Sequence, residues 1–322
     1  MKIFHSMKVE GLGYKTSMNK IKSCLIAALL AIPLSTFAVQ TQTIQLQSGA
    51  RMMVHSSILD AEKPTLILLP GIYRGYLPNE EILSVFTQKR LNWVSLHFSR
   101  HPESVIAGSQ FFTGMVTAQE LVSEVVQVKK ALRIKKPVLI SLSFSASLSP
   151  YWNKKEFPIL IETAPMGRHD ENNPPNANYQ AWQQWMELFP IWGPWLVQSN
   201  EFWTYRAFWL QKVDELSKSH ERYSLKRIQI AEGLSQLAWS SKGFDIRNQD
   251  FKNGPERFWI LGQNEDRLRL QLQLEAIQLH KETGFRGTRA YVIPNAGHIV
   301  PVEQPEAYVE TVKKILRRVR FQ

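Results

Sequence analysis

A serine that directly follows a short buried strand is the first candidate for chemistry in this sequence. The apolar residues 137–140 predict the strand, and the small residues Ser141, Ser143 and Ser145 come next, ahead of an apolar segment predicted as a helix. A serine in a sharp turn between a strand and a helix holds its hydroxyl above the edge of the sheet, where the first N–H groups of the helix point. Ser143 in this position is a candidate nucleophile, provided that the chain also supplies a histidine, an acid and N–H donors.

Two later segments supply such partners. A strand predicted at 257–261 is followed by Glu265 and Asp266, and Gly297-His298 stands just before the last predicted helix. A histidine beside a serine accepts its proton, and a carboxylate on the other ring nitrogen fixes the tautomer of the imidazole. The order serine, acid, histidine therefore favours nucleophilic catalysis over a serine-rich turn without chemistry.

Composition narrows the functional classes. The 322 residues are 44% hydrophobic, which argues against a disordered chain. The formal net charge is +11, but residues 1–38 hold five lysines and one glutamate, so the remainder carries about +7. No basic motif interleaved with aromatic residues stands out, so we expect no nucleic-acid partner. His97 and His101 are four apart but straddle a strand end and Pro102, and no phosphate loop or dinucleotide fingerprint is present. We therefore expect no metal and no cofactor.

The N-terminal segment resembles a secretory signal peptide. Residues 18–38 have a basic start, an apolar centre and small residues before a cleavage point near Ala38. Met18 is an alternative start of the chain, and an uncleaved N-terminal anchor is the competing interpretation. Export to the periplasm or out of the cell would leave a mature chain without cysteine, because Cys24 is the only one. Such a protein depends for its stability on its core alone.

Strands and helices alternate along most of the chain. Residues 40–55 predict a hairpin, further strands are predicted at 64–69, 92–98, 137–140, 157–161, 257–261 and 289–293, and helices at 79–91, 117–132, 270–280 and 305–319. This pattern predicts an α/β fold with a mostly parallel central sheet and helices on both faces. Residues 166–253 interrupt it, with no clean strand and seven of the ten tryptophans. We interpret them as a helical cap inserted into a core formed by 39–165 and 254–322.

Three of these segments together resemble the α/β-hydrolase superfamily, over nearly all of residues 40–322. The segment Gly297-His298 to Pro305 is similar to the Gly-His motif that leads into the final helix, and Gly262 to Leu268 is similar to the acid loop. The serine segment departs from the G-x-S-x-G signature, because Ser141 and Ser145 stand where that signature has glycine. Serine has a small side chain, so this turn could accommodate it in place of glycine at some cost. The register favours Ser143 over Ser145 as the nucleophile.

The resemblance implies a catalytic triad of Ser143, His298 and an acid. We expect the acid to be Asp266, from its Asp-Arg-Leu context, with Glu265 as the alternative, since family acids commonly lie three residues after the loop glycine.

The resemblance also implies an oxyanion hole and a substrate pocket. The oxyanion hole is expected to use the N–H groups of Phe144 and Ile72, with Gly71 permitting close approach of the substrate. Tyr73 is a further substrate-facing candidate, and Trp182 and Trp185 of the cap are candidates for an apolar roof over the substrate.

The sequence thus predicts an exported serine hydrolase that cleaves a carboxylic ester with an apolar acyl or alcohol part. Its expected partners are a small hydrophobic ester or lipid-like substrate and, transiently, a lipid surface. A catalytically silent protein of the same fold that binds a hydrophobic ligand or a partner is the alternative, because the turn lacks both glycines. A cofactor-free perhydrolase, a lyase or a peptidase using the same triad is a further alternative.

Overall fold

The computed structural model describes residues 39–72, 80–111, 115–167, 206–218, 221–248, 254–282 and 288–319. The predicted signal peptide at 1–38, Tyr73, Trp182 and Trp185 lie outside these ranges. All of the described ranges belong to the unit that begins at Val39.

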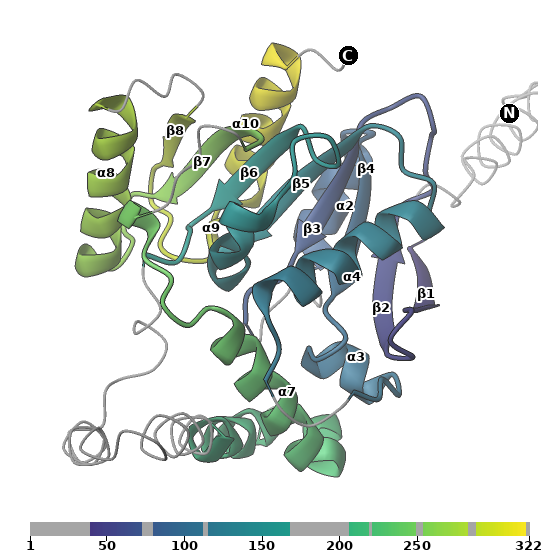
Figure 1. The fold of residues 1–322 in the computed structure, drawn as a ribbon. Helices are drawn as coiled ribbons and strands as arrows, with labels where there is room; N and C mark the ends of the chain where they lie inside the picture. Colours follow the sequence, from purple (N-terminus) through teal and green to yellow (C-terminus); the bar gives the residue numbers. More distant parts are fainter. Residues whose placement is uncertain are drawn as a thin grey trace, which may run out of the picture. The chain divides into compact units, whose positions relative to one another are not determined.

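The described residues form an eight-stranded sheet (Figure 1). Its strands are β1 (Gln40–Gln45), β2 (Arg51–Ser56), β3 (Thr65–Leu69), β4 (Asn92–His97), β5 (Pro137–Leu142), β6 (Ile159–Thr163), β7 (Glu256–Gly262) and β8 (Thr288–Ile293). They lie in the order β1-β2-β4-β3-β5-β6-β7-β8. The β1–β2 and β2–β4 pairs are antiparallel, and every other pair is parallel. The mostly parallel sheet expected from the sequence is therefore confirmed.

Helices cover both faces of this sheet. They include α2 (Glu80–Gln88), α3 (Pro102–Ile106), α4 (Ala118–Ala131), α7 (Arg227–Ser240), α8 (Arg267–Glu282), α9 (Val300–Glu303) and α10 (Pro305–Arg318), with 3-10 helices η2 (Ser143–Tyr151), η4 (Glu221–Lys226) and η5 (Ile246–Asn248). In Figure 1, α4 lies in front of the central strands and α2 and α10 lie behind them. The helix α4 begins with a capping box, in which the side chains of Thr117 and Glu120 accept from each other's backbone N–H groups.

Alternate residues of the buried strands enter two separate cores. Leu66 and Leu68 of β3 pack in the core that α2 and α10 cover, whereas Ile67 and Leu69 pack in the core that α4 covers. Successive side chains of a strand point to opposite faces, so a strand buried on both sides is apolar throughout. This explains the continuous apolar run at β3. Because β3 to β8 run parallel to one another, their carboxyl ends lie along one edge of the sheet.

The described parts of the predicted cap are mainly helical. A helix spans 206–217, and η4, α7 and η5 follow it. Several buried α7 residues, among them Leu234 and Trp239, belong to the same core as α4. Gly233 permits this packing, because a Cβ at that position would lie 2.2 Å from the carbonyl oxygen of Arg100.

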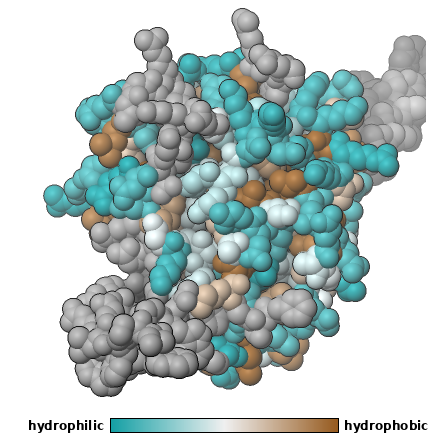
Figure 2. Space-filling model, viewed as in Figure 1, coloured by the Kyte–Doolittle hydropathy of each residue, from teal (hydrophilic) through white to brown (hydrophobic). Residues whose placement is uncertain are grey.

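The described surface is largely hydrophilic on the face shown in Figure 2, with hydrophobic residues in small groups. Leu225 and Ile228 are the most exposed large apolar residues of the η4–α7 region. Isolated residues of this kind are ordinary on protein surfaces. None of the helices among the described residues combines the length and apolar character needed to cross a bilayer.

Two buried histidines join the end of β4 to α3. The Nδ1 atoms of His97 and His101 lie 3.1 Å apart, and His101 Nδ1 also accepts from the N–H of Glu103 at the start of α3. His97 must therefore donate its Nδ1 proton to His101, which requires the His101 ring to be neutral. Burial lowers the pKa of His97, with the charges of His101, His55 and Arg222 acting in the same direction. Burial alone lowers the pKa of His101 to about 3.

This pair predicts a loss of stability in mild acid. Both folded-state pKa values lie below the unfolded value, so below pH 6.5 or so the unfolded chain binds protons that the folded chain does not. The contribution of the two neutral histidines to the free energy of unfolding is complete above that pH. Below it, this contribution falls by about 1.4 kcal/mol per pH unit for each histidine. Urea unfolding of wild type and His97→Gln between pH 7.5 and 5 checks this. The variant is expected to show the shallower decline, and parallel curves for the two proteins would contradict the prediction.

Candidate active site

Ser143 occupies a strained turn at the carboxyl end of β5. It is the first residue of η2, immediately after Leu142, and its φ is +49°. Positive φ is uncommon for residues other than glycine and persists only where the surrounding structure holds the residue in place. The Met166 N–H donates to the Ser143 carbonyl at 3.2 Å and ties the turn to the segment after β6. The geometry expected for a nucleophile in a strand-to-helix turn is therefore present.

The two serines that replace glycine are accommodated in different ways. Ser145 is fully buried, and its hydroxyl accepts from the Leu142 N–H at 2.8 Å and donates to the Leu142 carbonyl at 3.1 Å. Ser141 is also fully buried, and within the described residues its hydroxyl has no hydrogen-bond partner. Ser145 thus fastens the turn instead of competing with Ser143. The segment after β5 is a 3-10 helix, whereas the sequence suggested only a helix of unspecified type, and its Pro150 cannot donate a backbone hydrogen bond.

A chain of hydrogen bonds joins Ser143 to a buried carboxylate through His298. Ser143 Oγ lies 2.8 Å from His298 Nε2, and His298 Nδ1 lies 2.7 Å from Glu265 Oε2. An ionised carboxylate only accepts, so His298 carries its proton on Nδ1 and presents the Nε2 lone pair to the serine hydroxyl. The Glu265 side chain is 1% exposed and that of His298 is 29% exposed. This chain of hydrogen bonds is therefore shielded from solvent at Glu265 and accessible to solvent at His298.

The acid in contact with the histidine is Glu265, which corrects the expectation of Asp266. Asp266 Oδ1 accepts from the N–H groups of Leu268 and Arg269, at 3.1 and 3.2 Å, and so caps the start of α8. The sequence-based prediction began this helix at 270, whereas α8 begins at Arg267. An aspartate immediately before a helix is in the preferred capping position, and that signal was available in the sequence.

Glu265 is held by further donors on its other oxygen. The Asp266 N–H and the Arg269 guanidinium donate to Oε1 at 2.9 and 3.1 Å. Burial raises the pKa of Glu265, but the hydrogen bond and charge of His298, together with Arg269 and the Asp266 N–H, outweigh it. The net effect lowers the pKa, so the carboxylate remains ionised at neutral pH.

The predicted oxyanion donors lie at the carboxyl ends of two neighbouring strands. Ile72 follows Gly71 just after β3, and Phe144 is the second residue of η2 after β5, which pairs with β3. Among the described residues the Ile72 N–H has no hydrogen-bond partner. The first N–H groups of a helix likewise lack partners within it, which applies to Phe144. Both N–H groups thus remain the predicted donors to an oxygen anion.

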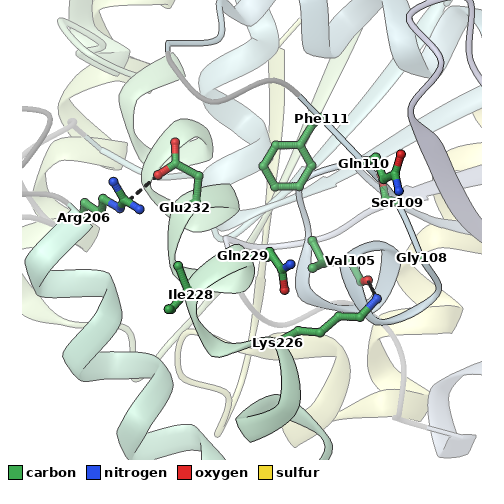
Figure 3. Close-up of a pocket in the computed structure, with 10 residues that line it drawn as sticks. All are labelled: Val105, Gly108, Ser109, Gln110, Phe111, Arg206, Lys226, Ile228, Gln229 and Glu232. Carbon is green, nitrogen blue, oxygen red and sulfur yellow. Dashed lines mark hydrogen bonds and ion pairs between the residues drawn. The ribbon is translucent and has the colours of Figure 1, made fainter.

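A separate cavity of about 310 Å³ lies between α3, the following loop, the helix at 206–217 and α7 (Figure 3). Its wall consists of Val105, Gly108, Ser109, Gln110, Phe111, Arg206, Lys226, Ile228, Gln229 and Glu232. An ion pair of 3.1 Å joins Arg206 to Glu232, and Lys226 donates to the Val105 carbonyl at 2.9 Å. This wall contains no member of the Ser143–His298–Glu265 chain. In the described part of the chain, no three His, Cys, Asp or Glu residues are grouped so as to hold a metal ion.

Comparison with known proteins gives a match in structure but not in sequence. No family model matches the sequence, and no curated protein matches it either. Among solved structures, an α/β-hydrolase enzyme from a Medee basin deep-sea metagenome library matches with a TM-score of 0.57, 13% identity and coverage of 87% of this chain and 99% of its own.

Two further solved structures are similar. A hydrolase from Pseudomonas aeruginosa has a TM-score of 0.56 at 15% identity, with 86% of this chain and 98% of its own covered. The carboxylesterase CesB from Bacillus subtilis has a TM-score of 0.54 at 13% identity, with 93% and 98% covered. At such identities the likeness concerns architecture. The sheet order and the helical layers of this protein are therefore those of the α/β-hydrolase fold.

Proposed function

We propose that the protein is an exported serine hydrolase that cleaves carboxylic esters with an apolar acyl or alcohol part. The observation that carries the proposal is the hydrogen-bonded chain from Ser143 through His298 to Glu265. The alignment is specific, because each of the two ring nitrogens of His298 has the partner that a catalytic triad requires. The positive φ of Ser143 adds support only in combination with this chain of hydrogen bonds, because Arg90, Arg133, Ala164 and Asn295 also have positive φ.

The proposed mechanism follows from the proton positions. Ser143 Oγ attacks the ester carbonyl while its proton moves to His298 Nε2, and the carbonyl oxygen becomes an anion that the N–H groups of Phe144 and Ile72 bind. The histidine returns the proton to the departing alcohol, which leaves an acyl group on Ser143. Water, deprotonated by the same histidine, then attacks the acyl carbon; the bond to Ser143 Oγ breaks, the histidine returns the proton to Ser143 Oγ, and the carboxylic acid leaves. Glu265 stabilises the positive imidazolium in both halves of the reaction.

The substrate class rests on the sequence more than on the described geometry. The tryptophan-rich segment within 166–253 supplies large apolar rings, and an apolar roof would favour esters with a hydrophobic part. Export rests on the signal-peptide pattern at 18–38. The lipid-like character of the substrate rests, like the apolar preference, on the tryptophan-rich segment.

Labelling by a fluorophosphonate tests the proposal directly. The wild type is expected to be labelled covalently, and Ser143→Ala should lose the label together with at least four orders of magnitude of ester turnover, on the order seen when a catalytic serine is removed. Ser147→Ala is the matched control, because the Ser147 hydroxyl is buried in the same 3-10 helix and has no partner among the described residues. A folded wild type that stays unlabelled would favour the silent binding protein.

Separate amide replacements of the two acids test the assignment of Glu265. Glu265→Gln removes the carboxylate that accepts from His298 and is expected to lower kcat by roughly 10⁴, as loss of the triad acid does elsewhere. Asp266→Asn keeps a good capping residue and is expected to change kcat by no more than about two-fold. Steady-state kinetics on one chromogenic ester suffices. A larger loss of kcat in Asp266→Asn than in Glu265→Gln would show the assignment to be mistaken.

A panel of esters tests the apolar preference. Acyl and alcohol parts are lengthened separately, and kcat/KM is expected to rise by up to about four-fold per added methylene on the side that the pocket binds, from about 0.8 kcal/mol per buried CH₂. Stopped assays below the solubility limit of each ester avoid effects of aggregation. A steady fall of kcat/KM with length on both sides would rule out an apolar pocket.

A further inference from the structure

The loop that carries His298 is bonded on both sides of the histidine by one carboxylate. Glu303 Oε2 accepts from the Gly297 N–H at 2.7 Å, and Glu303 Oε1 accepts from the Ile299 N–H at 3.0 Å. These are the residues immediately before and after His298. The Glu303 N–H also donates to the Ile299 carbonyl at 3.0 Å, so the link is reciprocal.

The same loop is packed against the end of β7 on its other side. A Cβ at Gly262 would lie 2.0 Å from the Gly297 carbonyl oxygen and 2.5 Å from that of Ala296. The Asn264 N–H donates to the Ala296 carbonyl at 2.7 Å. Backbone atoms cannot yield as a flexible side chain can, so the loop is fixed between the carboxyl end of β7 and the Glu303 carboxylate.

This arrangement controls where the imidazole points. The His298 ring must satisfy two partners at once, at 2.8 Å on Nε2 and 2.7 Å on Nδ1. The direction of its Cα–Cβ bond depends on the backbone around it. Glu303 binds this backbone through the Ile299 N–H, which belongs to the peptide group directly after His298, and through the Gly297 N–H, which belongs to the peptide group one residue further upstream. A misplacement of about 1 Å at a catalytic group is enough to cost roughly 10²-fold in rate.

We propose that Glu303 is a positioning residue for the reaction, one that orients His298 by binding the backbone before and after it. The proposal rests on the proposed hydrolase function. Glu303 does not touch the reacting atoms, and its effect is transmitted through the loop. A role limited to fastening the short helix α9 (Val300–Glu303) would affect stability but not the alignment of the ring.

The test replaces one acceptor at a time. Glu303→Gln keeps the length of the side chain but turns one of the two acceptors into a donor, so one N–H of the pair loses its bond. Glu303→Asp is the milder change, because it keeps the charge and both acceptor oxygens and only shortens the side chain by one methylene. Glu306→Gln is the matched control, an exposed glutamate three residues later in the first turn of α10.

The readouts separate alignment from stability. Glu303→Gln is expected to lower kcat and the rate of fluorophosphonate labelling by 10- to 100-fold with KM changed less than about two-fold, and Glu303→Asp by an intermediate amount, from the cost of misplacing a catalytic group. Glu306→Gln should match the wild type in all three quantities. Equal kcat and labelling rates in wild type and Glu303→Gln would overturn the proposal, and so would a loss that follows thermal stability across the three variants.

A proton NMR measurement distinguishes failure of this inference from failure of the hydrolase proposal. The downfield resonance of the His298 Nδ1 proton reports its hydrogen bond to Glu265 whether or not the protein turns over an ester. We expect it to be sharp in wild type and Glu306→Gln, and shifted or broadened in Glu303→Gln. An unlabelled wild type would end the hydrolase proposal, whereas an unchanged resonance in Glu303→Gln would end the positioning role.

Discussion

This site depends on one imidazole, that of His298, which must contact a hydroxyl and a carboxylate at the same time. These three groups come from three different segments of the chain. Ser143 follows β5, Glu265 follows β7, and His298 follows β8. Parallel strands present their carboxyl ends along one edge, so residues 33 and 155 positions from His298 in sequence come within 2.7 and 2.8 Å of its ring. The layered cores on both faces keep those strand ends in register.

The turn at Ser143 shows how a fold tolerates departure from its usual residues. Glycine is favoured on both sides of such a serine because backbone packs closely there. Here the Ser145 hydroxyl bonds the N–H and the carbonyl of Leu142, so the added side chain becomes part of the turn. The positive φ falls on Ser143 itself, and its strain is borne by the packing of β5 between β3 and β6.

Much of the fold was predictable from the sequence, because local patterns of apolar and capping residues indicate its strands and helices. Runs such as Leu66–Leu69 are buried on both faces and have few other structural interpretations, and the Thr117–Glu120 capping box fixed the start of α4. The choice between Glu265 and Asp266 was not settled by the same reasoning, since it depends on where α8 begins. A shift of the helix start from 270 to 267 places Asp266 at the cap and turns Glu265 towards His298. The bonds from Glu303 to Gly297 and Ile299 depend on the path of a loop, which no periodicity encodes.

The central claim is that Ser143 is a nucleophile activated by His298, and mass spectrometry of the fluorophosphonate-treated protein tests it most directly. Proteolysis followed by fragment sequencing identifies the modified residue without reference to any substrate. A single phosphonyl adduct on Ser143 is expected, with Ser141, Ser145 and Ser147 unmodified. An adduct on another serine of this turn, or a folded protein that carries no adduct at all, would contradict it.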